Sequence, residues 1–270
     1  MDNELLKACK ERDVERVVEL VRQGVNVNVK DQYKDTPLIY LAGSHAMVIK
    51  EDLVPAIRAL IQAGAKVDVR GSEGITPLYH AVLCYNEPVA LVLIELGANV
   101  NVKDRKGVSV LMQAVSRNLE NVINALLEKG VDTHCRCRAG KDVLSRIGAD
   151  TSPELVRKLI QFGADAKANH SSGLVKAILS NNWDTARELI ASGAEVDARG
   201  SPGNETYLMF LSRWGRKTSE SAVEQIKFLL SVNANPNAKN SLGQTALDIA
   251  IEAGNHEIVE VLRDTTSREG

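Results

Sequence analysis

A glycine recurs along this chain after an apolar stretch, and its spacing is nearly constant. It stands at positions 24, 64, 97, 130, 163 and 193, and Asn233 extends the series, at intervals of 40, 33, 33, 33, 30 and 40 residues. The residue that follows the last turn of a helix commonly adopts a left-handed backbone, which glycine tolerates best and asparagine next best. Recurrence at such a period is typical of stacked helical units, so we expect a repeat architecture.

A second landmark shares this period and marks where helices begin. A Thr, Ser or Asp, each a good N-cap, opens the segments that start at residues 36, 76, 109, 142, 206 and 245 ("TPLIYLA", "TPLYHAV", "SVLMQAV", "DVLSRIG", "TYLMFLS" and "TALDIAI"). The segment "NELLKAC" from Asn3 fits as a first copy. Each unit therefore reads as a short inner helix with one buried face, a turn, a second helix, a glycine and an extended turn. Only 4% of the residues are aromatic, which favours thin layers of Leu, Val, Ile and Ala.

These landmarks together resemble the ankyrin repeat, whose pattern runs D-x-x-G-x-T-P-L-H-x-A, two helices and G-A-D-V-N-A. The copy "NSLGQTALDIAIEAGNHEIVEVL", residues 240–262, comes closest to it. The resemblance implies an all-α solenoid of helix-turn-helix units joined by β-hairpin fingers. We count eight copies, starting near residues 3, 36, 76, 109, 142, 172, 206 and 245. They form a single array over 1–265, followed by a flexible tail at 266–270.

Three copies depart from the pattern. Insertions lengthen the second and seventh copies, at 44–56 and 214–225, and such loops are either functional or tolerated drift. The sixth copy, "NHSSGLVKAIL", lacks the Thr-Pro step, so Ser171 or Ser172 must cap its inner helix. We expect that helix to start late.

The bulk properties exclude several classes of protein. The net charge is −2, so nothing attracts the whole chain to nucleic acid. The N-terminus "MDNELLKACKERD" has no apolar core of a signal peptide, and no apolar run reaches the roughly 18 residues of a membrane span. Four cysteines are too sparse for a secreted disulfide scaffold. We expect a cytoplasmic, monomeric protein in a reducing compartment.

The stretch "THCRC", residues 133–137, is the one place where metal-ligating residues crowd together. His134, Cys135 and Cys137 offer three ligands, whereas a structural zinc site needs four. In the ankyrin pattern Cys137 stands where the turn-stabilising Asp belongs, so we interpret both cysteines as exposed hairpin residues. The motifs of nucleotide-binding loops, zinc proteases and serine hydrolases are absent. We expect no metal, no cofactor and no enzymatic activity.

The resemblance implies that a partner binds on the concave surface made by the fingers and the inner helices. The positions that match this surface and suit binding are Tyr33, Glu73, Arg105, Lys106, Arg117, Arg136, Arg138, Arg213 and Trp214. Residues 102–147 carry nine Lys or Arg against five Asp or Glu, a local charge of +4. We therefore expect a protein partner with an acidic surface. The chain would act on this partner either as an inhibitor that blocks it or as an adaptor. The alternatives are an anionic ligand or nucleic acid on the same patch, or fingers that are merely solvated.

Overall fold

The computed structural model describes residues 2–43, 52–71, 74–200, 203–215 and 220–266. The chain divides into two compact units, Met1–Arg146 and Ile147–Gly270, here called unit 1 and unit 2. Glu73, residues 44–51 and 216–219 of the two insertions, and 267–270 of the tail lie outside the described residues.

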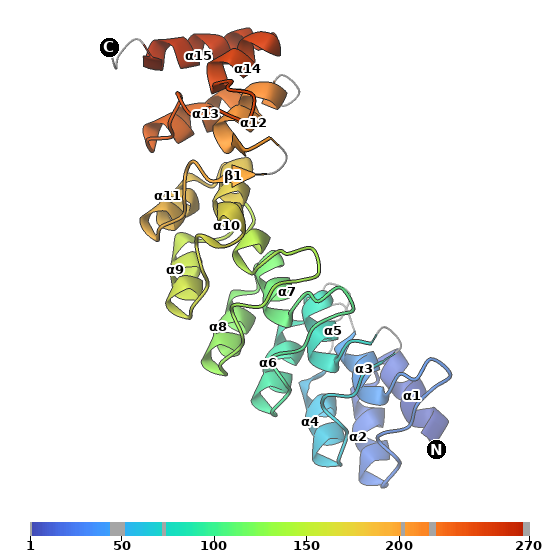
Figure 1. Ribbon diagram of the computed structural model, residues 1–270. Helices are drawn as coiled ribbons and strands as arrows, with labels where there is room; N and C mark the ends of the chain where they lie inside the picture. The colour runs from blue at the N-terminus through green and yellow to red at the C-terminus, as the bar shows by residue number, and fades with distance from the viewer. Residues whose placement is uncertain (1, 44–51, 72–73, 201–202, 216–219, 267–270) are drawn as a thin grey trace. The chain divides into compact units, whose positions relative to one another are not determined.

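Unit 1 is built from helix pairs that form two layers. Its helices are α1 (Asp2–Glu11), α2 (Val14–Arg22), α3 (Pro37–Ala42), α4 (Val54–Gln62), α5 (Pro77–Leu83), α6 (Glu87–Glu95), α7 (Val110–Ser116) and α8 (Glu120–Glu128), followed by a 3-10 helix at Leu144–Arg146. The inner helices α1, α3, α5 and α7 pack on one another in order, and the outer helices α2, α4, α6 and α8 do the same. Figure 1 shows these two rows side by side in the blue-to-green part of the chain.

Unit 2 repeats the same plan. Its helices are α9 (Pro153–Gln161), α10 (Ala168–Leu179), α11 (Trp183–Ala191), α12 (Tyr207–Trp214), α13 (Glu220–Ser231), α14 (Ala246–Glu252) and α15 (His256–Thr266). Two short strands, β1 (Arg199–Gly200) and β2 (Glu205–Thr206), form an antiparallel hairpin in which Arg199 pairs with Thr206. The expected all-α solenoid of helix pairs and hairpin fingers is confirmed.

The predicted caps start the inner helices as expected. The hydroxyls of Thr36, Thr76 and Thr206 each accept a hydrogen bond from the amide three residues later, and so do those of Ser109 and Thr245. Each bond satisfies an amide that has no partner within the helix, and losing one costs about 1 kcal/mol. At these five positions the start of the helix could therefore be located from local chemistry alone.

The predicted helix ends are confirmed too. The six recurring glycines have φ between +72° and +103°, and Asn233 has φ +64°. The chain then turns back on the helix it has left, as where the Ala65 amide donates to the Leu60 carbonyl at 2.9 Å. This hydrogen bond at the helix end directs the chain from each outer helix into the next finger.

Aliphatic side chains fill the space between the layers. A leucine lies two residues after the cap of most inner helices, and Leu38, Leu78, Leu111 and Leu208 are at most 1% exposed. Burying one such side chain contributes about 1.5–3 kcal/mol. Each of the two units is thus held together by many small and nearly equivalent contacts between neighbouring repeats.

The fifth repeat corrects the expected inner helix after Asp142, which is reduced to the 3-10 helix Leu144–Arg146. The Ser145 hydroxyl donates to the Asp142 carbonyl (2.6 Å), the acceptor that an α-helix would offer to the Arg146 amide. That amide instead donates to Val143 at 3.1 Å, and the Gly148 amide donates to the Thr151 hydroxyl at 2.9 Å. Local side-chain bonds have replaced the helical ladder.

The sixth repeat corrects a second expectation, because its inner helix starts early rather than late. Helix α10 begins at Ala168, whose amide donates to Asp165, so helical residues follow where other repeats form a finger. Ser171 lies inside the helix with φ +54° and does not cap its start. Its hydroxyl instead accepts from the Glu195 amide at 2.8 Å, which ties this repeat to the next one.

Candidate functional site

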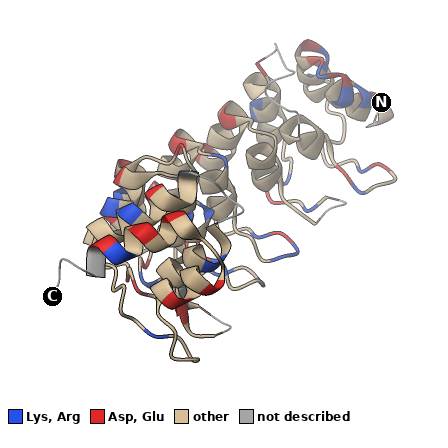
Figure 2. Cartoon of the chain, turned by 90° about the horizontal axis from the view of Figure 1, so that it is seen from above, with Lys and Arg blue, Asp and Glu red and all other residues tan. Residues whose placement is uncertain are grey.

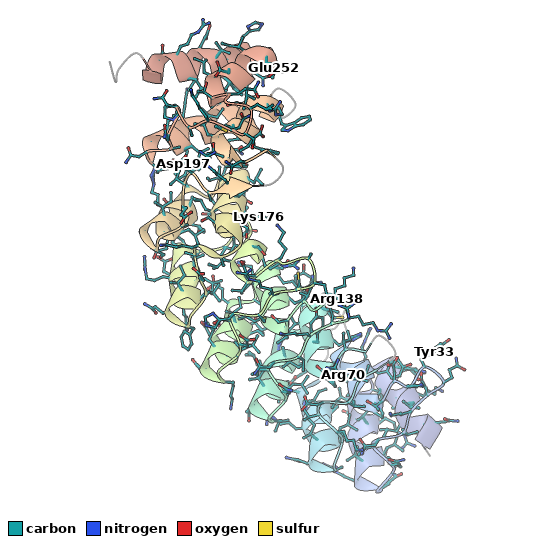
Figure 3. All side chains as sticks on the ribbon, viewed as in Figure 1. Tyr33, Arg70, Arg138, Lys176, Asp197 and Glu252 are labelled. Atoms are coloured by element: carbon teal, nitrogen blue, oxygen red, sulfur yellow. The ribbon has the colours of Figure 1, made fainter. Side chains whose placement is uncertain are left out.

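Two neighbouring fingers of unit 1, residues 103–109 and 136–142, carry most of the predicted basic residues. Arg105, Lys106, Arg136, Arg138 and Lys141 are all exposed, and we call this set the cationic finger surface. The fingers touch directly, because the Arg138 amide donates to the Lys106 carbonyl at 2.9 Å. Figure 2 shows Lys and Arg along the hairpin loops, and in Figure 3 the labelled Arg138 and Tyr33 extend from the finger side of the unit.

The finger 103–109 is shaped by one carboxylate. Asp104 accepts hydrogen bonds from the amides of Lys106 and Val108, both at 2.8 Å. The same arrangement recurs at Asp31 and at Asn240, so three fingers share this side-chain acceptor. The turn leaves Arg105 and Lys106 at the tip while the Asp104 carboxylate faces inward.

The finger 136–142 uses a thiol for the same purpose. Burial alone would raise the pKa of the Cys137 thiol, but hydrogen bonds from the Ala139 and Lys141 amides and from Arg146 lower it below its ordinary value. The Arg146 guanidinium lies 3.7 Å from the sulfur. Cys137 is 6% exposed and Cys135 7%, so the expectation that both are exposed hairpin residues is wrong. The sulfur of Cys137 replaces the missing carboxylate, and Cys135 packs as a small apolar residue.

The charge on this surface is only partly offset by its own fingers. Their two carboxylates are those of Asp104, which is half-buried, and of Asp142, which is buried. Burial raises the pKa of Asp142, although the nearby charges of Arg136 and Lys141 act in the opposite direction. In the part of the chain that the structure describes, the side chains of Lys106, Arg136 and Arg138 form no ion pair and no hydrogen bond. The surface therefore offers cationic donors to a ligand without breaking an internal contact.

Two further finger cations, Arg70 and Arg199, were missed by sequence reasoning. The Arg70 guanidinium donates to the Gly74 carbonyl, and Arg199 bridges the carbonyls of Asn204 and Lys239, both at 2.8 Å. These arginines close their own fingers, and both also reach the next finger, since Arg70 donates to the Lys103 carbonyl at 3.5 Å. The signal was present in the sequence as a Lys or Arg just before each finger turn, at positions 30, 70, 103, 136, 199 and 239.

Arg117, another of the predicted binding residues, does not belong to the exposed set. Its guanidinium carbon lies 4.3 Å from the centre of the Tyr85 ring, and the residue is half-buried. This cation–π contact engages both residues within unit 1. Tyr33 remains an exposed aromatic on its own finger, with 59% of its surface accessible.

In unit 2 the predicted pair Arg213 and Trp214 separates into two roles. The Arg213 guanidinium forms an ion pair with Glu205 at 2.6 Å, which largely neutralises it. Trp214 is 48% exposed at the end of α12, and Phe210, one turn earlier on the same face, is 45% exposed. Phe210 was missed, although its spacing of four residues from Trp214 could have revealed it. These two aromatic residues form an exposed apolar pair.

The described residues show neither a metal-binding group nor a membrane-spanning element. Within them, no three His, Cys, Asp or Glu side chains gather closely enough to hold a metal ion. In the same ranges, no helix has the length and apolar character needed to cross a bilayer.

Comparison with known families agrees with this architecture. A model described as ankyrin repeats (3 copies) matches residues 5–104, 44–137 and 111–200, and a model described as ankyrin repeats (many copies) matches residues 219–263. Together these matches cover most of the chain, and they coincide with the capped helix pairs and fingers described above. The chain therefore belongs to the ankyrin-repeat family.

Proposed function

We propose that this protein is a non-catalytic binding module that holds an acidic protein partner on the cationic finger surface. Ankyrin repeats generally mediate protein–protein interaction. The observation that carries the proposal is the set of exposed, unpaired cations Lys106, Arg136 and Arg138 on two touching fingers whose own carboxylates face inward.

Such a surface acts in two stages. Its field speeds the approach of an acidic partner, and on contact each guanidinium forms charge-assisted hydrogen bonds with a carboxylate. Little internal energy is lost on binding, because Lys106, Arg136 and Arg138 give up no ion pair and no hydrogen bond among the described residues. We propose that the protein acts by covering its partner, as an inhibitor or antagonist does, with an adaptor role as the alternative.

The same surface could attract nucleic acid, but its composition favours protein. Proteins that bind single strands combine cations with aromatic side chains on which bases stack. Among the described residues of unit 1, the exposed large apolar side chains are Tyr33 and Tyr85, and the Tyr85 ring is covered by Arg117. We also propose that the protein is a monomer in the cytoplasm; the four free thiols, Cys9, Cys84, Cys135 and Cys137, support a reducing compartment.

Charge reversal tests the proposal. The variant Lys106→Glu, Arg136→Glu, Arg138→Glu and the wild type are used to capture proteins from a nuclease-treated lysate of the source cells, followed by quantitative mass spectrometry. We expect the wild type to retain a specific acidic protein and the variant to lose it, because attraction becomes repulsion.

The matched control reverses three exposed cations at or just beyond the ends of outer helices, Arg22, Lys66 and Lys129. It changes the net charge by the same amount and should retain the partner. Loss of the partner from both variants, or from neither while both show native circular dichroism, would contradict the proposal. A partner that is captured from an untreated lysate but not from the nuclease-treated one would support nucleic acid instead.

A further inference from the structure

We infer that Arg146, at the base of the cationic finger surface, recognises a carboxylate of the acidic partner through a bidentate contact. This inference rests on the proposed function, and it assigns to one residue a selectivity that the exposed cations of the finger tips do not supply. Arg146 is not among the binding residues that the sequence predicted.

The fifth repeat places Arg146 where a ligand can reach it. Arg146 is the last residue of the 3-10 helix and stands four residues after the cap position Asp142. In the three preceding repeats this place is held by Tyr40, His80 and Gln113, and all four of these residues are half-buried. The position therefore lies at the boundary between the packed inner row and the surface.

The contact that Arg146 makes within its own repeat is a weak one. In the second repeat the Tyr40 hydroxyl donates to the carboxylate of Asp31, the turn acceptor of its finger. The equivalent pair in the fifth repeat is Arg146 and Cys137, with 3.7 Å between the guanidinium nitrogen and the sulfur. A thiol sulfur is a weak acceptor, whereas a carboxylate offers two charged oxygens. Because Cys137 stands where Asp31 and Asp104 stand in their fingers, Arg146 lacks the carboxylate that this position would supply.

Most of the donors of Arg146 are unused. A guanidinium carries five N–H donors in a planar fork. Among the residues that the structure describes, Cys137 supplies the one hydrogen bond of Arg146, no ion pair is formed, and the Nε–H is buried without an acceptor. Unsatisfied donors cost free energy, and a partly buried charge attracts an anion more strongly than an exposed charge does. A carboxylate that accepts two parallel N–H bonds would offset this cost.

Arg146 lies within electrostatic reach of both fingers. Its contact residue Cys137 belongs to the finger 136–142, between two exposed arginines in the sequence. Burial and Asp104, which accepts the Tyr79 hydroxyl, raise the pKa of Tyr79, and the charge of Arg146 acts in the opposite direction. The exposed cations of the tips attract any anion, whereas the planar fork of Arg146 selects a group with two parallel oxygens. The tips would thus steer the partner, and Arg146 would fix one of its carboxylates.

Two substitutions test this role, each with a matched control. Arg146→Lys keeps the charge and removes the fork, and Arg138→Lys makes the same change at an exposed finger tip. Cys137→Asp supplies an internal carboxylate that would occupy Arg146, and Ala139→Asp adds the same charge at an exposed position of the same finger. The probe is a fluorescently labelled peptide of ten glutamates, and its binding to the full chain is measured by anisotropy at low salt.

We expect Arg146→Lys and Cys137→Asp each to weaken peptide binding about tenfold, because each removes the bidentate contact. The controls Arg138→Lys and Ala139→Asp should stay within about threefold of the wild type, since exposed charge pairs contribute little. The double variant Arg146→Lys, Cys137→Asp should bind about as well as the weaker single variant, because both changes act on one contact. In nitrogen-15 NMR spectra, the Nε–H signal of Arg146 should shift when the peptide is added. Cys137→Asp should shift the same signal without peptide.

Four outcomes would overturn the inference. The first is an Arg146→Lys variant that binds like the wild type while Lys106→Glu, Arg136→Glu, Arg138→Glu loses the peptide, which would leave the proposed function in place. The second is an equal loss in Cys137→Asp and Ala139→Asp, which would follow charge alone. This comparison keeps Arg146 and so decides the matter even if Arg146→Lys does not fold. The third is failure of the peptide to bind the wild type, whereas capture from the lysate decides the proposed function separately. The fourth is tighter binding of a phosphoserine peptide of equal charge, which would replace the carboxylate by a phosphate.

Discussion

At the scale of single residues, different side chains fill the same structural role at equivalent positions of several fingers. Asp31, Asp104 and Asn240 each accept two backbone amides of their finger, and Cys137 does so with a sulfur. The sequence showed that Cys137 occupies the Asp position, but it did not show that the side chain is buried. Burial followed from the inward direction of the turn acceptor, which a pattern of letters does not contain.

The turn role of Cys137 predicts a graded response to substitution. Cys137→Ala removes an acceptor from two amides and should lower the free energy of unfolding by about 1–3 kcal/mol. Cys137→Asp, which restores the acceptor used in other fingers, should lie within about 0.5 kcal/mol of the wild type or above it. Chemical denaturation of both variants measures the difference. Equal stability of the Ala variant and the wild type would show that the sulfur does not hold the turn.

The same residue gives stability a dependence on pH. Folding lowers the pKa of the Cys137 thiol, so the unfolded chain binds more protons than the folded chain between the folded and the ordinary thiol pKa. The contribution of this residue is therefore present above the ordinary thiol pKa and is lost as pH falls through the folded pKa. In the Cys137 series above, the difference between wild type and Cys137→Ala should shrink across this window as the pH is lowered.

At the scale of the elements, helix ends were predictable and helix survival was not. Thr76, Ser109 and the glycine series act through bonds to residues three to five positions away, so their effect is visible in the sequence. In the fifth repeat Asp142 is a good cap, yet no α-helix follows it. The Ser145 hydroxyl binds the Asp142 carbonyl and the Gly148 amide binds the Thr151 hydroxyl, in place of helical backbone hydrogen bonds. Helical backbone bonds and local side-chain bonds compete for the same groups in this repeat. A cap motif indicates only the helical bonds, so it does not predict which set forms.

Two glycine substitutions separate these effects. A Cβ would meet nothing within 4 Å at either Gly130 or Gly148, but Gly130 has φ +72° and Gly148 has no such conformation. Gly148→Ala should raise the free energy of unfolding by about 0.4–1 kcal/mol, because it restricts the unfolded chain. Gly130→Ala should lower it by about 1 kcal/mol or more, because alanine is strained in the left-handed region. Thermal unfolding followed by circular dichroism compares the pair, and shifts of the same sign would contradict the assigned C-cap.

At the scale of the whole molecule, the period of the sequence was sufficient for the fold but not for the surface. Within each unit, neighbouring repeats pack through equivalent leucines, so the architecture of the unit follows from one repeat applied several times. The surface depends instead on side-chain contacts that the repeat pattern does not specify. Examples are the stacking of Arg117 on Tyr85 and the pairing of Arg213 with Glu205, which removed two of the predicted cations. The predicted cations of fingers 103–109 and 136–142 stay exposed because the carboxylates of these fingers face inward.

The exposed aromatic pair of unit 2 gives the final prediction. If Trp214 contacts the partner, burying its ring contributes about 2 kcal/mol or more, through a contact that forms late in association. Trp214→Ala should then raise the dissociation rate by about 30-fold, with an association rate within a few-fold of the wild type. Reversal of Lys106, Arg136 and Arg138 should act mainly on association, and its effect should weaken as salt screens the charges.

Surface plasmon resonance with the captured partner at two salt concentrations distinguishes these effects. Phe162→Ala is the matched control, because Phe162 is 45% exposed in the same unit but lies at the end of the outer helix α9. It should leave both rate constants unchanged. If Trp214→Ala behaves like Phe162→Ala while the finger variant loses binding, the partner is held by unit 1 alone. The aromatic pair would then be no part of the binding surface, because a desolvated tryptophan contact cannot be removed without faster release.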